Sequence, residues 1–271
     1  MPGKPVRKKV RLDQLLVDGG WFADVRAATG PVMAGQVRVG DEVVTKVGTM
    51  VDVEADIVVK GQDRYASRGG YKLARALDAF GIDVTGLSVL DAGASTGGFT
   101  DCLLQRGAAK VLAVDVGYGQ LRGRLAADAR VVSMERTNIS DLVDKRPLPQ
   151  PVGLCTADLA YLSLLTAIPI LAVASGNAPM VCLVKPLYEG LGDDRKDNRE
   201  AIMAVMERLV RALDDSGFGT LGAVVSPIYG GRGAIECLVH VVPGRHTDVA
   251  SLMAALAADW DENAPREIAR G

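Results

Sequence analysis

The chain has 271 residues, of which 48% are hydrophobic and 24% charged, and its formal net charge is −2. This composition is typical of a folded globular protein and excludes disorder throughout the chain. The best candidate for a membrane span, residues 164–174, is shorter than the roughly 20 residues that cross a bilayer and contains Pro169. The basic N-terminus lacks an apolar signal region. We therefore expect a cytoplasmic protein that has no membrane partner.

Cysteine and histidine offer little chemistry in this sequence. The four cysteines are Cys102, Cys155, Cys182 and Cys237. They lie far apart and form no C-x-x-C pair, so they predict buried free thiols rather than a zinc site or a disulfide framework. Only two histidines are present, His240 and His246, and both come late in the chain. We expect no metal site and no Ser-His-Asp triad.

The first 60 residues have the pattern of a small α+β domain. Leu12, Leu15 and Leu16 fall on one face of a helix predicted over residues 11–19, and a second short helix is predicted over 24–28. Short strands are predicted over residues 36–39, 43–44, 51–54 and 57–59. Gly30-Pro31 is expected to interrupt the second helix, because proline lacks an amide hydrogen and disfavours helix at the residue before it.

Basic charge is concentrated at the start of the chain. Residues 1–38 contain seven Lys or Arg and three Asp, which gives a local net charge of +4. Such a patch attracts the phosphates of a nucleic acid, although a solvated disordered tail has the same composition. The predicted RNA-binding residues are Arg7, Lys8, Lys9, Arg11 and Arg26.

A second, larger domain is predicted over residues 71–271, after a polar and glycine-rich linker over 61–70. Predicted strands cover residues 88–92, 110–114, 130–133, 153–156 and 180–184, and they alternate with helices over 71–80, 99–105, 121–127, 163–174 and 199–213. This alternation predicts a doubly wound α/β sheet. Residues 222–227 and 236–242 break it and predict a terminal hairpin. We therefore expect a mostly parallel sheet that has an antiparallel edge strand.

A glycine-rich turn, DAGASTGGFT over residues 91–100, joins the first of these strands to the next helix. Such turns let a ligand approach the backbone closely. Asp115 ends the next strand, 22 residues after Gly93, where nucleotide-binding sheets present a carboxylate to a ribose. The glycines do not match G-x-G-x-x-G, which favours S-adenosylmethionine over NAD. The predicted cofactor-binding residues are Asp91, Gly93, Ala94, Ser95, Gly97, Gly98, Phe99, Asp115 and Val116.

Four charged residues at separated positions complete the candidate site. Lys72 stands in SRGGYKL, Asp158 in ADL, Lys185 in LVKP and Glu236 in IEC. Together with the glycine-rich turn, this order of Lys, Asp, Lys and Glu resembles the catalytic tetrad of the FtsJ-like ribose 2′-O-methyltransferases. That resemblance implies a Rossmann-like methyltransferase sheet that binds S-adenosylmethionine.

The N-terminal domain narrows the resemblance. RLD at 11–13, AGQVRV at 34–39 and VTK at 44–46 resemble the S4 RNA-binding domain. With GASTGGFTD at 93–101, AVDVGYGQL at 113–121 and ERTN at 135–138, the chain resembles the TlyA family. These are bacterial rRNA cytidine 2′-O-methyltransferases that are often named hemolysins. The resemblance implies methylation of a cytidine ribose in ribosomal RNA within ribosomal subunits.

The expected roles follow from the chemistry of a hydroxyl, which is a poor nucleophile at neutral pH. We expect Lys185 to remove its proton, Asp158 to orient Lys185, and Lys72 and Glu236 to steer the ribose. Residues 188–198 are polar, which fits a mobile lid or a plain solvent loop equally well.

Two alternative functions stay open at this stage. One is a membrane-active hemolysin, suggested only by the family's traditional name. The other is a non-catalytic RNA-binding factor in ribosome assembly. The sequence indicates no oligomeric state.

Overall fold

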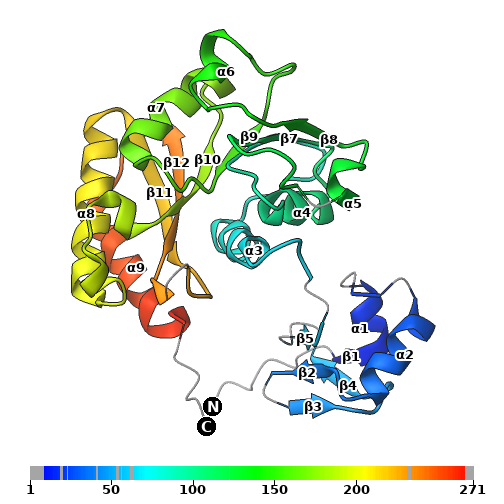
Figure 1. Ribbon diagram of the computed structural model, residues 1–271. Helices are drawn as coiled ribbons and strands as arrows, with labels where there is room; N and C mark the ends of the chain where they lie inside the picture. Colours follow the sequence, from blue (N-terminus) through cyan, green and yellow to red (C-terminus); the bar gives the residue numbers. More distant parts are fainter. Residues whose placement is uncertain are drawn as a thin grey trace. The chain divides into compact units, whose positions relative to one another are not determined.

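The computed structural model describes residues 9–18, 21–22, 24–40, 42–52, 55, 57–61, 64–121, 123–230 and 233–265. The chain divides into two compact units, residues 1–64 and residues 65–271 (Figure 1). Each unit has its own buried core.

The N-terminal unit packs two helices with five short strands. Its elements are β1 (Lys9–Arg11), α1 (Leu12–Asp18), α2 (Val25–Met33), β2 (Val37–Val39), β3 (Glu42–Val44), β4 (Met50–Asp52) and β5 (Ile57–Val59). Strand β2 lies between β3 and β5, and β1 pairs with β4, all antiparallel. Leu12 and Leu16 of α1 are fully buried in the core of this unit, together with Val32 and Val37. The helical face predicted from the leucine spacing is therefore the face that packs.

The predicted interruption at Gly30-Pro31 is wrong, because α2 continues through Pro31 to Met33. Proline removes one helical hydrogen bond here. The amides of Ala34 and Gln36 close the last turn on the carbonyls of Gly30 and Pro31, at 2.9 and 3.0 Å. Val32, next to the proline, is fully buried in the core. Tertiary packing thus offsets the local cost of the proline.

The larger unit is built on a seven-stranded sheet. Its strands are β6 (Ser88–Ala92), β7 (Lys110–Val114), β8 (Val131–Met134), β9 (Leu154–Ala157), β10 (Met180–Val184), β11 (Phe218–Val225) and β12 (Cys237–Pro243). Their order across the sheet is β11-β12-β10-β9-β6-β7-β8. Strand β12 runs antiparallel to both of its neighbours, β10 and β11, and the other adjacent strands of this sheet pair in parallel. The mostly parallel α/β fold predicted from the sequence is confirmed.

The antiparallel strand is not at the edge, where the sequence analysis placed it. After α8 (Arg199–Asp215) the chain forms β11 at the edge of the sheet, and the hairpin then places β12 between β11 and β10. Cys237, at the start of β12, therefore pairs with both Val184 and Val225. This arrangement brings the residue before β12 next to the carboxyl end of β10.

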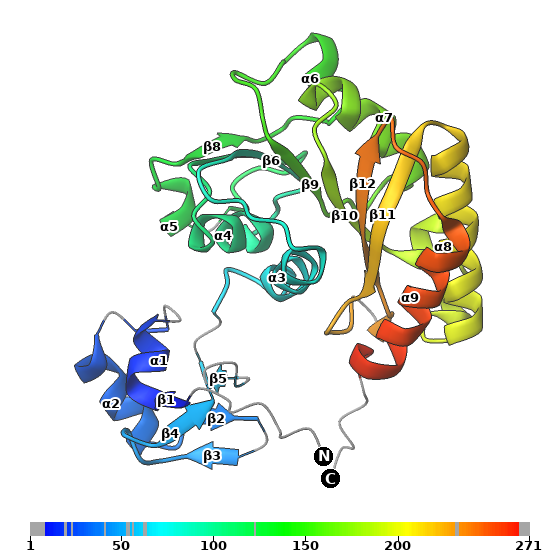
Figure 2. The same ribbon diagram turned by 180° about the vertical axis from the view of Figure 1, so that it is seen from behind.

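Helices cover both faces of the sheet (Figure 2). They are α3 (Gly69–Phe80), α4 (Gly98–Gln105), α5 (Gly123–Ala126), α6 (Asp141–Asp144), α7 (Leu164–Ser175), α8 (Arg199–Asp215) and α9 (Val249–Asn263), with the 3₁₀ helices η1 (Pro186–Glu189) and η2 (Asp193–Arg195). Buried residues of α3, α4 and α5 pack on one face and those of α6, α7, α8 and α9 on the other. Alternate residues of β10 enter the two cores, as the period of a strand requires.

The predicted linker is shorter than the sequence analysis assigned. Tyr65 and Ala66 are buried in the core of the larger unit, and α3 already begins at Gly69. The Ala66 amide donates to Asp101 Oδ2 at 2.7 Å. The polar composition of residues 61–70 concealed these two apolar anchors.

Candidate active site

The glycine-rich turn joins β6 to α4 at the carboxyl ends of the parallel strands. Gly93 has φ +84°, and a Cβ atom there would lie 2.4 Å from the carbonyl oxygen of Asp158. The amides of Gly93 and Ala94 both donate to the Val114 carbonyl, at 2.8 and 3.1 Å. Only glycine permits this φ and this close approach at small cost. The turn is therefore held against the segment that follows β9.

Most of the predicted turn residues surround one cavity of about 230 Å³. Gly93, Ala94, Ser95, Gly98 and Phe99 line it, as the sequence analysis expects of a ligand site. Lining residues that the sequence analysis did not select are Ser67, Arg68, Gly69 and Thr96. The first three precede or begin α3, which packs on α4. The SRGG motif next to Lys72 is the sequence signal that identifies them.

Asp115 lies at the end of β7, beside a smaller hollow. Its carboxylate accepts hydrogen bonds from the Ser95 and Gly117 amides at 2.9 and 2.7 Å. Ala94 and Ser95 line both this hollow and the larger cavity, so the two adjoin. Glu135 also lines the hollow, although the sequence analysis quoted it only within the ERTN motif. The backbone thus fixes the orientation of the Asp115 carboxylate.

Three predicted cofactor residues lie outside both linings. Asp91 is fully buried beneath the turn, where it accepts from Thr100 Oγ1 at 2.6 Å and Thr156 Oγ1 at 3.0 Å. Burial raises the pKa of Asp91 to about 6. Gly97 is the N-cap of α4, with φ +97°, and Val116 is half exposed. These positions suit Asp91 and Gly97 to supporting the turn.

The four tetrad residues come together as two ion pairs. Lys72 Nζ contacts Glu236 Oε2, and Lys185 Nζ lies 2.5 Å from Asp158 Oδ1. Lys72 comes from α3, whereas Asp158, Lys185 and Glu236 adjoin the ends of the neighbouring strands β9, β10 and β12. Each lysine has its own carboxylate, and all four side chains are mostly buried. The sheet order therefore joins residues that lie far apart in the sequence.

A glycine makes room for one member of this group. A Cβ atom on Gly230 would lie 2.1 Å from Glu236 Oε1, so a larger residue there displaces the carboxylate. Gly230 also donates its amide to the Ala234 carbonyl at 2.8 Å. Gly230 therefore leaves the space that the Glu236 carboxylate occupies.

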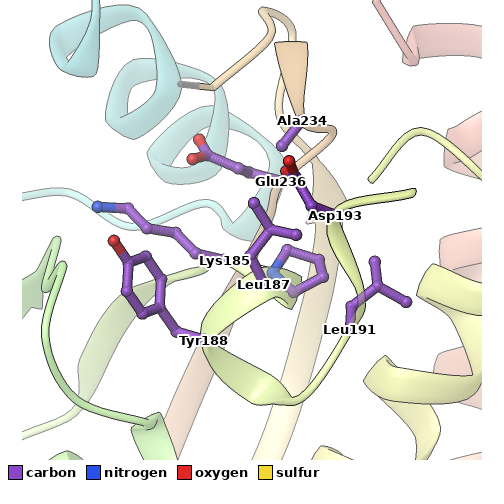
Figure 3. Close-up of a pocket in the computed structure, with 8 residues that line it drawn as sticks. Lys185, Leu187, Tyr188, Leu191, Asp193, Ala234 and Glu236 are labelled. Carbon is purple, nitrogen blue, oxygen red and sulfur yellow. The ribbon is translucent and has the colours of Figure 1, made fainter. Parts of the chain in front are cut away.

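The tetrad separates two cavities. Lys72 and Asp158 line the cavity of the glycine-rich turn. Lys185 and Glu236 line a different cavity of about 490 Å³ (Figure 3). The other lining residues of this second cavity are Pro186, Leu187, Tyr188, Leu191, Asp193 and Ala234. The sequence analysis did not identify it, because its wall is built from η1, η2 and a loop, none of which has a periodic pattern.

Residues 188–198, for which the sequence left a lid or a plain loop open, are tied to their surroundings. Glu189 accepts from Ser163 Oγ at 2.6 Å and from the Leu164 amide at 2.8 Å, so it caps the start of α7. The Ile235 amide donates to the Lys196 carbonyl at 2.9 Å. These bonds attach η1 to α7 and the segment after η2 to the loop that precedes β12.

The predicted RNA-binding residues belong to the N-terminal unit. Arg7 and Lys8 lie outside the described residues. Lys9 and Arg26 are exposed. Arg11 donates to both oxygens of the buried Asp13 carboxylate, at 3.0 and 2.6 Å, and holds the pKa of Asp13 below its usual value. Asp13 thus offsets the charge of Arg11, whereas Lys9 and Arg26 present theirs to solvent.

Comparison with known proteins decides the family. The model of the FtsJ-like methyltransferases matches residues 65–242. The chain belongs to this family. The tetrad therefore stands in a methyltransferase, and the FtsJ-like resemblance inferred from the four motifs is confirmed.

Named relatives match most of the chain. The chain is 40% identical over 245 residues to a Mycobacterium tuberculosis protein named 16S/23S rRNA (cytidine-2′-O)-methyltransferase TlyA, covering 84% of this chain and 88% of that protein. It is 35% identical to Hemolysin A of Brachyspira hyodysenteriae, covering 86% of this chain and all of the relative. The resemblance to the TlyA family is thereby confirmed.

A solved structure extends the similarity to three dimensions. A protein from Streptococcus thermophilus, named as a hemolysin, is 34% identical and superposes with a TM-score of 0.64 over 95% of this chain and 99% of its own. Within the described residues, no helix of the structure has the length and apolar character to cross a membrane.

Proposed function

We propose that this protein transfers a methyl group from S-adenosylmethionine to the ribose 2′ hydroxyl of a cytidine in ribosomal RNA. The observation that carries the proposal is the assembly of Lys72, Asp158, Lys185 and Glu236 into two ion pairs, one buried and one partly buried, beside the glycine-rich turn. The names of the TlyA relatives supply the RNA class and the nucleotide. A cytoplasmic location is part of this proposal, because ribosomal RNA is the proposed substrate.

The residues around the turn fit S-adenosylmethionine. Gly93 and Gly98 line the cavity, and Asp115 presents an oriented carboxylate in the adjoining hollow. Carboxylates at this position accept hydrogen bonds from ribose hydroxyls. Gly93 to Phe99 would hold the methionine half and Asp115 the ribose. When bound, the cofactor supplies a methyl group that is already activated by its sulfonium.

The remaining tasks belong to this chain, which must align the hydroxyl and accept its proton. Asp158 fixes the position of Lys185 Nζ through the 2.5 Å ion pair. Lys185, once its amine has released its own proton to solvent, would accept at Nζ the proton that the 2′ hydroxyl loses when it takes up the methyl group. Lys72 and Glu236, which are paired with each other, border the ribose and hold it in position.

A purely RNA-binding role does not explain this arrangement. Removing charges from water is costly, and a buried ion pair contributes little net stability compared with apolar packing. Two ion pairs that are mostly withdrawn from water lie where two cavities meet. A role in a reaction explains this position better than a role in stabilising the fold does. The exposed Lys9 and Arg26 of the N-terminal unit suit it to contact RNA phosphates, as expected for an S4-like domain.

The proposal is tested by incubating the full chain with labelled S-adenosylmethionine and ribosomal subunits from cells that lack this protein. We expect label in RNA, none without subunits, and none with Lys185→Ala. Label in ribosomal protein, or transfer that survives Lys185→Ala, would contradict the proposed function.

A further inference from the structure

The second cavity, bordered by Lys185 and Glu236, has a composition that suits a nucleobase. Pro186, Leu187, Leu191 and Ala234 provide apolar walls, and Tyr188, which is 47% exposed, adds an aromatic ring. Bases that leave a stack are commonly held between such groups and read by a few polar atoms. A volume of about 490 Å³ admits a nucleotide base with part of its sugar.

The position of this cavity relative to the tetrad indicates which base it holds. A hydroxyl that accepts a methyl group approaches from the side opposite the group that leaves. The donor side is the cavity of the glycine-rich turn, which Lys72 and Asp158 border. The acceptor side is then the cavity that Lys185 and Glu236 border. The base is attached to the carbon next to C2′, so it must lie within one sugar ring of Lys185.

The exposed Asp193 is the carboxylate of this cavity that no lysine engages within the described residues. Glu236 is paired with Lys72, and Lys185 with Asp158. Asp193, at the start of η2, lines the same cavity, and across the described residues no hydrogen bond or ion pair engages its carboxylate. An ionised carboxylate only accepts hydrogen bonds. It therefore favours a base with an amino group and disfavours one with a carbonyl oxygen at the same position.

We infer that this cavity holds the base of the nucleotide to be methylated, with Tyr188 stacking on its ring and Asp193 accepting a hydrogen bond from the 4-amino group of cytosine. Carboxylates pair with this amino group in protein–nucleic acid complexes. Uracil has an oxygen in its place, which the Asp193 charge repels. The inference rests on the proposed function and adds to it the residue that selects cytidine.

The test compares the full chain with Asp193→Ala and Asp193→Asn on two RNAs, one with the natural target cytidine and one with uridine there. The measured quantity is the ratio of kcat/KM for the two. Asp194→Ala is the matched control, because Asp194 is the next residue of the same short helix but does not line the cavity. Calorimetry with S-adenosylmethionine verifies that each variant is folded.

We expect Asp193→Ala to lower the preference for cytidine by about tenfold, as for loss of one good base contact. Asp193→Asn should raise uridine methylation, because its amide donates to the uracil oxygen. Tyr188→Leu should lower kcat/KM on both RNAs by about tenfold, in the range for lost base stacking, and leave their ratio unchanged. Asp194→Ala should match the wild type.

An unchanged cytidine-to-uridine ratio in both Asp193 variants would overturn the inference, as would an equal change in Asp194→Ala. Failure of the proposed function has a different signature. In that case the wild type transfers no methyl group to either RNA.

Discussion

Breaking the buried Lys72–Glu236 pair should destabilise the fold, even though the intact pair adds little net stability. The two side chains are only 10% and 5% exposed, and they join α3 to the residue before β12. Glu236→Gln keeps the shape of the side chain but removes its charge. Lys72 is then left as a buried cation without its counter-ion.

The burial of this pair determines how much stability Glu236→Gln should lose. Breaking one partner of a buried pair costs roughly 3–5 kcal/mol, because the remaining charge stays desolvated. The Arg211–Glu207 pair of α8, at 2.7 Å, is a surface control, since its side chains are 60% and 47% exposed. Pairs of that kind contribute about 0–1 kcal/mol, so Glu207→Gln should change stability little.

The assay is urea-induced unfolding of each variant, followed by circular dichroism. Lys72→Met combined with Glu236→Gln should cost less than the sum of the single substitutions, because the double variant buries no charge in this pair. A coupling free energy above about 1 kcal/mol is expected for residues in direct contact. If Glu236→Gln is as stable as Glu207→Gln, or if the two single effects simply add, Glu236→Gln does not leave Lys72 as a buried charge without a counter-ion.

Four further outcomes are expected. Asp115→Ala should weaken S-adenosylmethionine binding by roughly 1.5–3 kcal/mol, the range for a lost hydrogen bond to a charged group, and calorimetry that shows unchanged affinity would contradict the assigned cofactor site. Lys185→Ala should abolish methyl transfer while S-adenosylmethionine affinity stays nearly unchanged, because proton removal is needed only in the transition state; normal turnover would exclude Lys185 as the base. Burial raises the folded-state pKa of Asp91 from 3.8 to about 6, so the wild type binds an extra proton on folding. As pH rises from about 4 to about 7, it should lose roughly 2–3 kcal/mol of stability relative to Asp91→Asn, and equal pH dependence of unfolding in the two proteins would refute this. Replacing Lys9 and Arg26 together by Glu should weaken binding to ribosomal subunits and flatten its salt dependence without changing cofactor affinity; an unchanged salt slope would show that these exposed charges do not contact RNA.

The sheet was predictable because its strands are short apolar runs between turn residues, as in Met180–Val184. The position of Asp91 was not. It belongs to β6, where successive side chains alternate between faces, and Leu90 and Ala92 enter the core opposite to it. The sequence motif shows that Asp91 lies next to the turn. It does not show whether the side chain points into the core of the sheet or into the cavity.

The helix over Val249–Asn263 had a usable signal that the sequence analysis did not use. Leu252, Leu256 and Trp260 recur at four-residue spacing and are all buried against the sheet. The second cavity had no such signal, since η1 and η2 are single turns of 3₁₀ helix. Its chemistry became visible only when folding brought Asp193 and Tyr188 beside Lys185.

The central claim is tested most directly by locating 2′-O-methyl groups in ribosomal RNA, through resistance to alkaline cleavage, in cells with and without this protein. Our account predicts cytidine positions that are methylated only when the wild-type chain is present and that stay unmethylated when Lys185→Ala replaces it. Identical 2′-O-methylation in the two strains would contradict it.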